Sequence, residues 1–376
     1  MNNRQRVNAI LHFQPCDRVP AVAFGYWNET VDKWAQEGHI TPDEALGYRQ
    51  MGDGSPADVS IMQRLGFDFN WSNCLSGNNT LHPPFVPEVL RVEASGAKVM
   101  RNHEGLIVRV HDDIVSIPSE IGTSLTGREA WETLYLPRLR FSPDRVDHAH
   151  FKRMEALDDI RDIPLGLHLG SLYGFIRNLL GVEELAYLEV DDEELYQEII
   201  DTVADMCFQL ADYILRTYKI HFDYAHFWED ICFKNGPLVS PRTFDRFVGR
   251  HYKRLTDLVH AHGIDIVSLD CDGCIDALIP TWLHNGVNTM FPIEVGTWNA
   301  SIAPWRQQYG KSLRGVGGVD KRVFAGDKQA VEQEIERLKP LVDAGGFIPC
   351  IDHRIPPDAH FALVQYYCEC FRKAFG

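Results

Sequence analysis

The stretch Ile264–Asp272 reads IDIVSLDCD and predicts a β-strand that ends in carboxylates. Side chains of a strand alternate between its two faces, so Asp270 and Asp272 share one face while Cys271 lies on the other, apolar face. A helical pattern follows directly, over residues 275–285. An apolar face that packs on helices and a polar face that points away from them are typical of a strand in an α/β fold.

The same rhythm of a short strand followed by a helix recurs through the second half of the chain. Strands are expected at Val19–Phe24, Ile163–Gly170, His221–Trp228, Ile264–Asp272, Val287–Glu294, Leu313–Asp320 and Phe347–His353. Helices are expected at Val182–Tyr187, Asp192–Tyr218, from Ser240 onward, and at Ile275–Asn285, Lys328–Leu341 and Ala359–Phe375. This alternation predicts one α/β domain over residues 1–376, a (β/α)8 TIM barrel. An open doubly wound sheet is the alternative, disfavoured because no G-x-G-x-x-G turn follows any strand.

Residues 87–118 follow a different pattern. Three strand-like runs, VLRVEA, AKVMRN and LIVRVHDD, are separated by the turn pairs Ser95-Gly96 and Glu104-Gly105. The segment therefore predicts an antiparallel β flap inserted into the barrel.

Composition excludes several classes of protein. Hydrophobic residues make up 45% and charged residues 24%, ordinary values for a globular chain. The formal net charge of −16 argues against nucleic-acid binding, which needs a basic surface. The nine cysteines are scattered, as in proteins of reducing compartments. With no apolar signal region and no run of about 20 apolar residues, we expect a cytoplasmic protein that does not enter a membrane.

Acidic residues recur at the carboxyl ends of the predicted strands. The set comprises Glu229-Asp230, Asp270 with Asp272, Glu294, Asp320, and Asp352-His353. In a TIM barrel those ends meet at one mouth, where barrel enzymes keep their chemistry. Any one of these residues could simply cap the following helix. Five such strand ends together indicate a site that binds a cation, shares protons or faces a cationic group.

A cysteine-based metal site is a competing interpretation. Cys271-x-x-Cys274 and Cys350-x-x-His353 together have the residue types of a Cys3His zinc site. The two pairs lie much farther apart than the roughly 15–20 residues of zinc ribbons, and Cys271 is expected on the apolar strand face. His353, next to Asp352, is the strongest single candidate for a metal ligand or proton donor, with a structural histidine as the alternative.

Weaker candidates for substrate binding lie at two other strand ends. His168 lies near the end of one strand, and Tyr26, Trp27 and Asn28 follow the first strand. The two aromatic rings suit the wall of a site for a flat ligand, although they could equally fill the core.

Several stretches resemble the uroporphyrinogen decarboxylase superfamily, which also contains methyltransferases that work with corrinoid proteins. They are RQRVNAILHFQPCDRVP at the start, WEDICFKNGPLVSPRTF, DCDGCIDALIPTWLHNGVNTMFPIEVG, GGVDKR and CIDHRIPPD. The resemblance runs nearly end to end. It implies a (β/α)8 barrel with its site at the carboxyl ends of the strands, and members that often form homodimers.

The resemblance favours the methyltransferase branch. The decarboxylases carry an M-R-Q-A-G-R run where this chain has Ala23–Thr30 (AFGYWNET), which has no arginine. The methyltransferases bind zinc with an H-x-C pair and a late cysteine, and here Asp270 and Asp272 lie at the pair and His353 at the late cysteine. Oxygen and nitrogen ligands would make a harder, more Lewis-acidic metal site than sulfur does.

The expected function is therefore transfer of a methyl group from a small O-methyl substrate, such as a methoxy-aromatic compound, to the cobalt of a separate corrinoid protein. A metal ion, expected to be zinc, would bind to Asp270, Asp272 and His353 and polarise the leaving oxygen. Glu229 or Glu294 would complete the metal shell or protonate that oxygen. The corrinoid would come with a partner, because the chain has no D-x-H-x-x-G run.

Two other functions stay open. One is a metal-free carboxy-lyase of the decarboxylase type, in which Asp320 and His353 would act as acid and base. The other is a barrel without catalytic activity that binds a partner, although such a protein would have no reason to keep so many carboxylates at its mouth.

Overall fold

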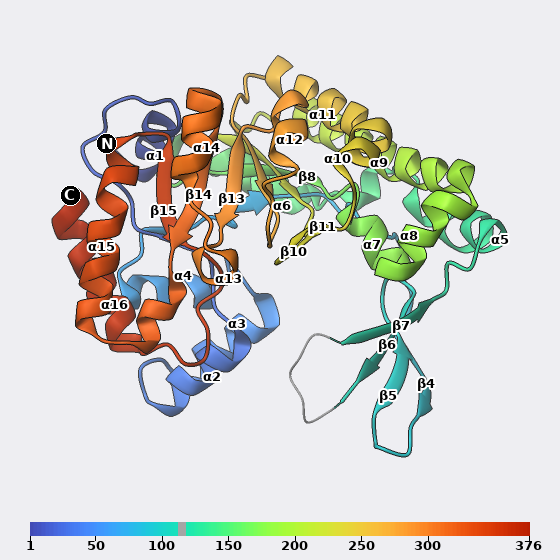
Figure 1. Cartoon of the computed structure of the whole chain (residues 1–376), viewed down its shortest axis with the longest axis horizontal. Coiled ribbons are helices and arrows are strands. Elements are labelled where there is room, and N and C mark those ends of the chain that lie inside the picture. The colour runs from blue at the N-terminus through green and yellow to red at the C-terminus, as the bar shows by residue number, and fades with distance from the viewer. Residues whose placement is uncertain (112–117) are drawn as a thin grey trace.

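The computed structural model describes residues 1–111 and 118–376 as a β/α barrel with an inserted antiparallel sheet (Figure 1). The barrel strands are β1 (Val22–Ala23), β2 (Phe69–Asn70), β3 (Cys74–Leu75), β8 (Gly166–Gly170), β9 (Tyr224–Trp228), β12 (Val267–Asp270), β13 (Thr289–Ile293), β14 (Arg314–Val319) and β15 (Phe347–Ile351). Their order is β2-β1-β15-β14-β13-β12-β9-β8-β3, and every neighbouring pair is parallel.

The two edge strands of this sheet, β2 and β3, are consecutive in the chain, and the short segment between them closes the barrel. β2 and β3 are separated only by residues 71–73, and together they occupy one of the eight barrel positions. The backbone N–H of Trp71 still donates to Ala23 of β1, at 3.1 Å, while the carbonyl of Asn73 accepts from Gly166 of β8, at 3.0 Å. The predicted (β/α)8 architecture is confirmed, with a second strand that is broken in its middle and that the sequence pattern does not reveal.

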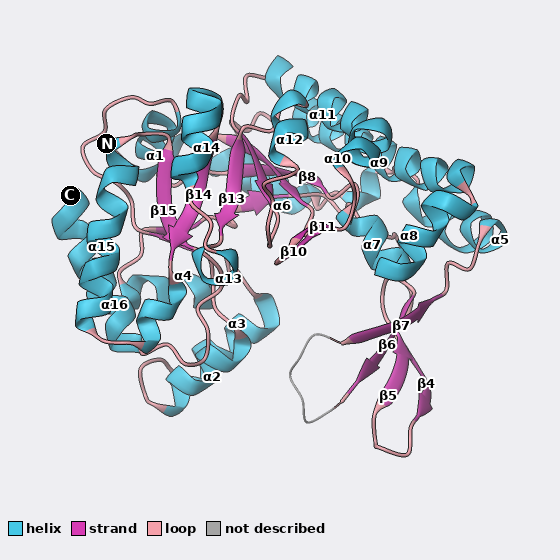
Figure 2. Ribbon diagram, viewed as in Figure 1, coloured by secondary structure: helices cyan, strands magenta, loops and turns pink. Residues whose placement is uncertain are grey.

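Helices surround the sheet (Figure 2). They are α1 (Asn3–Leu11), α2 (Asn28–Gln36), α3 (Pro42–Met51), α4 (Pro56–Leu65), α5 (Arg128–Ala130), α6 (His148–Leu157), α7 (Gly174–Leu180), α8 (Val182–Asp191), α9 (Glu193–Thr217), α10 (Pro241–Phe244), α11 (Arg250–Ala261), α12 (Ile279–His284), α13 (Val295–Trp298), α14 (Ile302–Tyr309), α15 (Lys328–Asp343) and α16 (Phe361–Phe375). None of the helices in the described part of the chain has the length and apolar character that crossing a membrane requires.

Local sequence explains why these elements form. β13 and β15 are buried along their whole length, as expected for parallel strands that have the barrel interior on one side and helices on the other. α9 buries Leu195, Ile199 and Val203, whose spacing of four follows the helical period. The helical region that starts at α10 begins as predicted, because the Ser240 side chain caps it by accepting from the backbone N–H of Thr243, at 3.0 Å.

The inserted sheet, called the flap below, consists of β4 (Glu88–Val92), β5 (Lys98–Arg101), β6 (Leu106–Val110) and β7 (Ser119–Thr123). All its pairings are antiparallel, which confirms the predicted insertion and adds a fourth strand beyond it. Residues 112–117 of the predicted segment lie outside the described residues.

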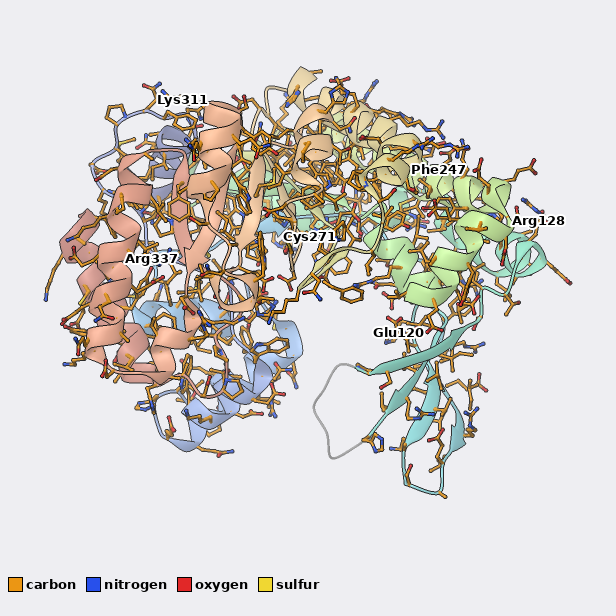
Figure 3. All side chains as sticks on the ribbon, in the orientation of Figure 1. Glu120, Arg128, Phe247, Cys271, Lys311 and Arg337 are labelled. Atoms are coloured by element: carbon orange, nitrogen blue, oxygen red, sulfur yellow. The ribbon has the colours of Figure 1, made fainter. Side chains whose placement is uncertain are left out.

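The flap is attached beside the barrel mouth. The carboxylate of Glu120 accepts from the backbone N–H of Val182, the first residue of α8, at 3.2 Å (Figure 3). In Figure 1 the arrows of β13, β14 and β15 point toward the side of the molecule from which the flap projects. The flap and the carboxyl ends of the strands therefore lie on the same side of the barrel.

Candidate functional site

Three side chains from three strand ends meet at the barrel mouth. Asp272 follows β12, Glu294 follows β13 and His353 follows β15. Each offers one ligand atom, and these atoms all lie within 4.8 Å of one another. Within residues 1–111 and 118–376, no other group of three or more histidine, cysteine, aspartate or glutamate side chains is gathered this closely. These three residues are called the trio below.

Backbone and side-chain hydrogen bonds hold the trio in place. The Nε2 atom of His353 lies 3.2 Å from Oδ2 of Asp272. Glu294 accepts from the backbone N–H of Gly273 at 2.5 Å and from the hydroxyl of Thr297 at 2.7 Å. Gly273 has a φ of +86°, and a Cβ atom there would collide with the backbone of Cys232. Only glycine fits this close approach, which places its N–H against Glu294.

The trio fits a divalent metal ion. Oδ1 of Asp272 and Nδ1 of His353 are buried, and neither has a hydrogen-bond partner among the described residues. Polar atoms are rarely left unpaired in a protein interior, so one such atom on each of two neighbouring side chains is consistent with a site that binds a ligand. Two carboxylates and one imidazole form a ligand set that zinc accepts, with a position left open for a substrate or water. Such a set is harder than the sulfur sets of thiol-binding zinc sites.

Further carboxylates lie beside the trio. Asp270 ends β12, and Asp230 follows β9. Burial raises the pKa of Asp270 well above its ordinary value, and the negative charge of Asp272 adds to the shift. Burial and the charge of Asp272 also raise the pKa of Asp230, while Arg177 opposes that shift. The excess of negative charge at the mouth favours a cation.

Aromatic rings form one wall beside His353. The indole of Trp27 stacks on the His353 ring with centroids 5.5 Å apart and an interplanar angle of 27°. Phe24 meets the same imidazole edge-on at 5.9 Å. Trp27 is 40% exposed, so it can contact a bound molecule as well as the imidazole. This stacking places the end of β1 beside the end of β15.

An ion pair anchors the turn after β15 to the loop between α3 and α4. Arg354 donates through Nη2 to Oδ2 of Asp53 at 2.6 Å and through Nη1 to the hydroxyl of Tyr48 at 3.0 Å. That hydroxyl also accepts from the backbone N–H of Tyr26 at 2.9 Å. Gly25 has a φ of +79°, and a Cβ atom there would collide with Asp53. The contacts fix the turn that carries His353 against the turn that carries Trp27.

The predicted metal ligands are only partly brought together. Asp272 and His353 belong to the trio, and its third member is Glu294, which was expected to complete the metal shell or to protonate the leaving oxygen. Asp270, the remaining predicted ligand, is not a member. It lies one layer deeper in the barrel, in register with Trp228 of β9.

The cysteine-based alternative does not form in the described part of the chain. Cys271 is buried directly after β12, and its sulfur accepts from the backbone N–H of Ile231 at 3.3 Å. Cys350 is buried as well, and burial raises the pKa of both thiols well above the ordinary value. Both thiols are protonated at neutral pH, which suits them to packing rather than to binding metal.

Two predicted acidic residues have all or most of their oxygens occupied by the protein. Glu229 is fully buried and accepts from the backbone N–H groups of Leu172, Tyr173 and Gly174 at 2.9, 2.9 and 2.6 Å, and from the hydroxyl of Tyr252. Asp320 accepts from the backbone N–H of Arg322 at 3.0 Å and forms an ion pair with its guanidinium at 2.7 Å. Both carboxylates thus bind the start of a helical segment, the alternative role that a strand-end acid can have.

The predicted substrate-binding residues lie at different depths. Tyr26 is buried in the core between Trp34 and Tyr48, at centroid distances of 5.5 and 5.4 Å. Asn28 is exposed as the first residue of α2. His168 points into the barrel interior, where its ring lies 5.6 Å from that of His226.

Sequence reasoning missed His226, Trp228 and Arg354. The first two alternate with buried Phe227 on β9, so the period of two was the signal that could have placed both on one face of the strand. Arg354 follows His353 directly, but the sequence contains no sign that Asp53 is its partner.

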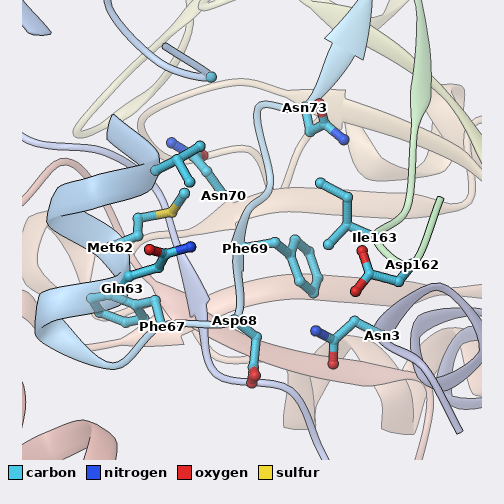
Figure 4. Close-up of a pocket in the computed structure, with 12 residues that line it drawn as sticks. Asn3, Met62, Gln63, Phe67, Asp68, Phe69, Asn70, Asn73, Asp162 and Ile163 are labelled. Atoms are coloured by element: carbon cyan, nitrogen blue, oxygen red, sulfur yellow. The ribbon is translucent and has the colours of Figure 1, made fainter. Parts of the chain in front are cut away.

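A separate cavity of about 340 Å³ lies away from the mouth (Figure 4). It is lined by residues of α4 and β2, by Asn3 of α1 and by the segment before β8 that contains Asp162 and Ile163. None of the trio residues lines it, so it is not part of the candidate site.

Two solved structures are similar to this chain to different degrees. A solved structure of a methyltransferase from Methanosarcina mazei matches with a TM-score of 0.60 at 15% identity, over 99% of each chain. A B12-independent methionine synthase from Shewanella sp. W3-18-1, solved in complex with selenomethionine, matches with a TM-score of 0.48 at 10% identity, over 95% of this chain and 98% of its own. No curated protein sequence matches the chain. At 15% identity the first likeness supports the fold alone.

The family model described as uroporphyrinogen decarboxylase (URO-D) matches residues 143–374, which is more than half of the chain. This region contains all three trio residues and six of the barrel strands: β8, β9, β12, β13, β14 and β15. It also contains the hairpin strands β10 (Cys232–Phe233) and β11 (Gly236–Pro237), which form a sheet of their own. The chain belongs to the uroporphyrinogen decarboxylase (URO-D) family.

Proposed function

We propose that this protein is a methyltransferase that moves a methyl group from a small methoxy-aromatic substrate to the cobalt of a separate corrinoid protein. The observation that carries the proposal is the trio of Asp272, Glu294 and His353, with two buried polar atoms left unpaired among the described residues. It lies at the barrel mouth, where barrel enzymes bind their substrates.

A metal ion held by the trio, which we propose to be zinc, would withdraw electron density from the ether oxygen of the substrate. The hard ligand set supports an oxygen-bound rather than a sulfur-bound substrate. The exposed indole of Trp27 beside His353 offers a surface on which an aromatic ring can stack.

The reaction balances without an oxidant or reductant beyond the corrinoid. The bond between the methyl carbon and the oxygen breaks, a bond between that carbon and cobalt forms, and Co(I) supplies the electron pair. The leaving oxygen takes up a proton and becomes a hydroxyl group. Asp230, whose pKa is raised by burial, would hold that proton beside the trio.

The first experiment is metal analysis of the purified protein and of the variants Asp272→Ala and His353→Ala. Asp276→Asn is the matched control, because Asp276 lies on the same loop but outside the trio and accepts from the indole N–H of Trp305. We expect about one zinc per chain in the parent and the control, and its loss in both alanine variants.

The same four proteins are then mixed with cob(I)alamin and 4-methoxyphenol, and methylation of cobalt is followed by its visible spectrum. Methyl transfer by the parent and by the control, but not by the two alanine variants, supports the proposal. A protein that needs no metal and instead releases carbon dioxide from a carboxylic acid would be a carboxy-lyase of the decarboxylase type, and the proposal would be wrong.

A further inference from the structure

A layer of polar side chains lies inside the barrel, beneath the trio. His168 on β8, His226 on β9 and Ser268 on β12 are neighbours in register on three adjacent strands. Side chains in register share a face, and His226 and Ser268 share theirs with Trp228 and Asp270 at the mouth. The three residues therefore point into the barrel, roughly 7 Å below the ends of the strands, since a strand rises by about 3.3 Å per residue.

Two members of this layer have unpaired polar atoms. His226 is 5% exposed, Ser268 is fully buried, and neither Nδ1 of His226 nor Oγ of Ser268 has a hydrogen-bond partner among residues 1–111 and 118–376. A buried polar atom that finds no partner costs about 1–3 kcal/mol. Two of them side by side at the bottom of a candidate site indicate a ligand that completes their hydrogen bonds.

The third member has a defined hydrogen-bonding role. Nδ1 of His168 accepts from the backbone N–H of Gly170 at 3.0 Å and lies 3.2 Å from the amide nitrogen of Asn79. A nitrogen that accepts carries no proton, so the proton of the neutral imidazole is on Nε2, which is therefore a donor. Unlike its neighbours Leu167 and Leu169, which are buried, His168 is partly exposed.

The layer carries no net charge. Burial lowers the pKa of His168 to about 4 and that of His226 well below the ordinary value of histidine, so both rings are neutral at physiological pH. Neutral imidazoles and a hydroxyl can exchange hydrogen bonds with an uncharged group, but they cannot offset the loss of water around a carboxylate or an ammonium ion.

Aromatic rings border the layer. The ring of Phe291 lies 6.0 Å from that of His226 and 4.5 Å from that of Phe24, and Trp71 lies 6.2 Å from Phe291. Apolar walls with a few converging polar groups are the usual composition of a small-molecule site. They favour a flat ring over a flexible chain.

We propose that His168, His226 and Ser268 bind an uncharged hydroxyl group on the substrate, at the end of the ring opposite to the methoxy group. The proposal rests on the proposed function for the position of the methoxy group at the trio. It makes the substrate class para-methoxyphenols, because a ring with two oxygens in para positions spans most of the distance between the layer and the mouth.

The test measures binding by calorimetry in the zinc-loaded protein. Four probes share the methoxyphenyl group: 4-methoxyphenol, anisole without the hydroxyl, 4-methoxybenzoate with a negative charge, and 4-methoxybenzylamine with a positive one. We expect 4-methoxyphenol to bind at least about tenfold more tightly than anisole, since two hydrogen bonds distinguish them. The two charged probes are expected to bind more weakly than anisole.

Ser268→Ala and His226→Phe are expected to reduce the preference for 4-methoxyphenol over anisole to about twofold or less, with little change for anisole. Ser268→Ala removes a single oxygen, which keeps the test valid if His226→Phe does not fold. His251→Phe is the control, because His251 is a buried histidine on α11, outside the barrel interior, that pairs with Asp201 at 2.7 Å. It should keep the preference of the parent.

Equal binding of 4-methoxyphenol and anisole, no binding of either, or tighter binding of a charged probe would overturn the inference. So would a Ser268→Ala variant with the full preference. Methyl transfer to cob(I)alamin is measured on the same samples. A hydroxyl preference that depends on Ser268 but comes without methyl transfer would overturn the proposed function and support the binding layer.

Discussion

Asp58 on α4 shows how one buried carboxyl group can make the stability of the folded protein depend on pH. It is fully buried and accepts through Oδ2 from the backbone N–H of Gly54 at 2.8 Å and from the amide of Asn70 at 3.2 Å. Its other oxygen has no partner among the described residues. Burial raises the pKa of Asp58 to about 6, so the folded protein holds the proton more tightly than the unfolded chain does.

The sign of the effect follows from proton uptake. Between the unfolded pKa near 4 and the folded pKa of about 6, the folded state binds the proton and the unfolded state does not, so this contribution to stability falls as pH rises through that window. A difference of about two pKa units corresponds to about 3 kcal/mol. Asp58→Asn keeps the shape without the charge. We expect it to gain stability relative to the parent by up to about 3 kcal/mol between pH 4 and pH 7.

Urea unfolding at pH 4.5 and pH 7.5 measures this difference. Asp43→Asn serves as the control, because Asp43 is an exposed carboxylate in the first turn of the neighbouring helix α3. A stability difference between Asp58→Asn and the parent that does not change with pH would contradict the expected titration.

The second prediction for a single residue concerns the buried carboxylate of Glu229. Its carboxylate binds three backbone N–H groups at the start of α7 and the hydroxyl of Tyr252. In Glu229→Gln an amide nitrogen would face two of those donors, and the lost hydrogen bonds should lower the free energy of unfolding by about 2–4 kcal/mol. Chemical denaturation gives the change in stability, and metal analysis of the folded fraction should find the parent's content.

Glu294→Gln is the comparison, since Glu294 belongs to the trio. It should lose metal with a smaller change in stability. If Glu229→Gln instead folds as stably as the parent and loses activity, Glu229 has the catalytic role that the sequence suggested.

At the scale of elements, the ends of β1 and β15 are joined by Asp53, Tyr48 and Arg354. This contact holds the turn of His353, and groups that orient a metal ligand typically change metal affinity by about 10- to 100-fold when they are removed. We expect Asp53→Ala to weaken zinc binding by that factor. Adding Arg354→Ala should cost less than the sum of the two single effects, because both remove the same contact.

Competition with a chromophoric chelator measures the zinc affinity of the single and double variants. The exposed ion pair between Arg49 and Asp32, at 3.2 Å, provides the matched control, because it joins the neighbouring helices α3 and α2 at the surface. Unchanged zinc affinity in Asp53→Ala would show that the contact supports the fold without positioning His353.

The same scale shows what sequence patterns can and cannot predict. In the barrel strands from β8 to β15, apolar residues either alternate with polar ones or form continuous runs, so these strands can be predicted. The acidic residues at their carboxyl ends can be located in the same way. β2 and β3 have two residues each, too few for a period to show. Which carboxylates meet depends on the register and curvature of the sheet. For that reason Glu294 rather than Asp270 joins Asp272 and His353, and Glu229 points toward a helix.

At the scale of the whole molecule, the trio links strands that are far apart in the chain. Asp272 and His353 are 81 positions apart, yet their side chains lie 3.2 Å from each other. An unfolded chain cannot hold these groups together, so a metal ion that binds the trio binds the folded state almost exclusively. Binding of this kind adds to the free energy of unfolding.

We therefore expect zinc to stabilise the whole barrel. At a free zinc concentration of 100 times the dissociation constant, the added free energy of unfolding is about 2.7 kcal/mol. Thermal unfolding of metal-free protein, titrated with zinc, should show a midpoint that rises with zinc concentration, and the chelated protein should return to the starting value. His353→Ala should show no such rise, while the exposed His39, which follows α2 and lies outside the trio, can be changed to alanine as a control. A rise of equal size in His353→Ala would mean that zinc stabilises the fold from another place, and an unchanged midpoint in the parent would mean that the trio binds no zinc.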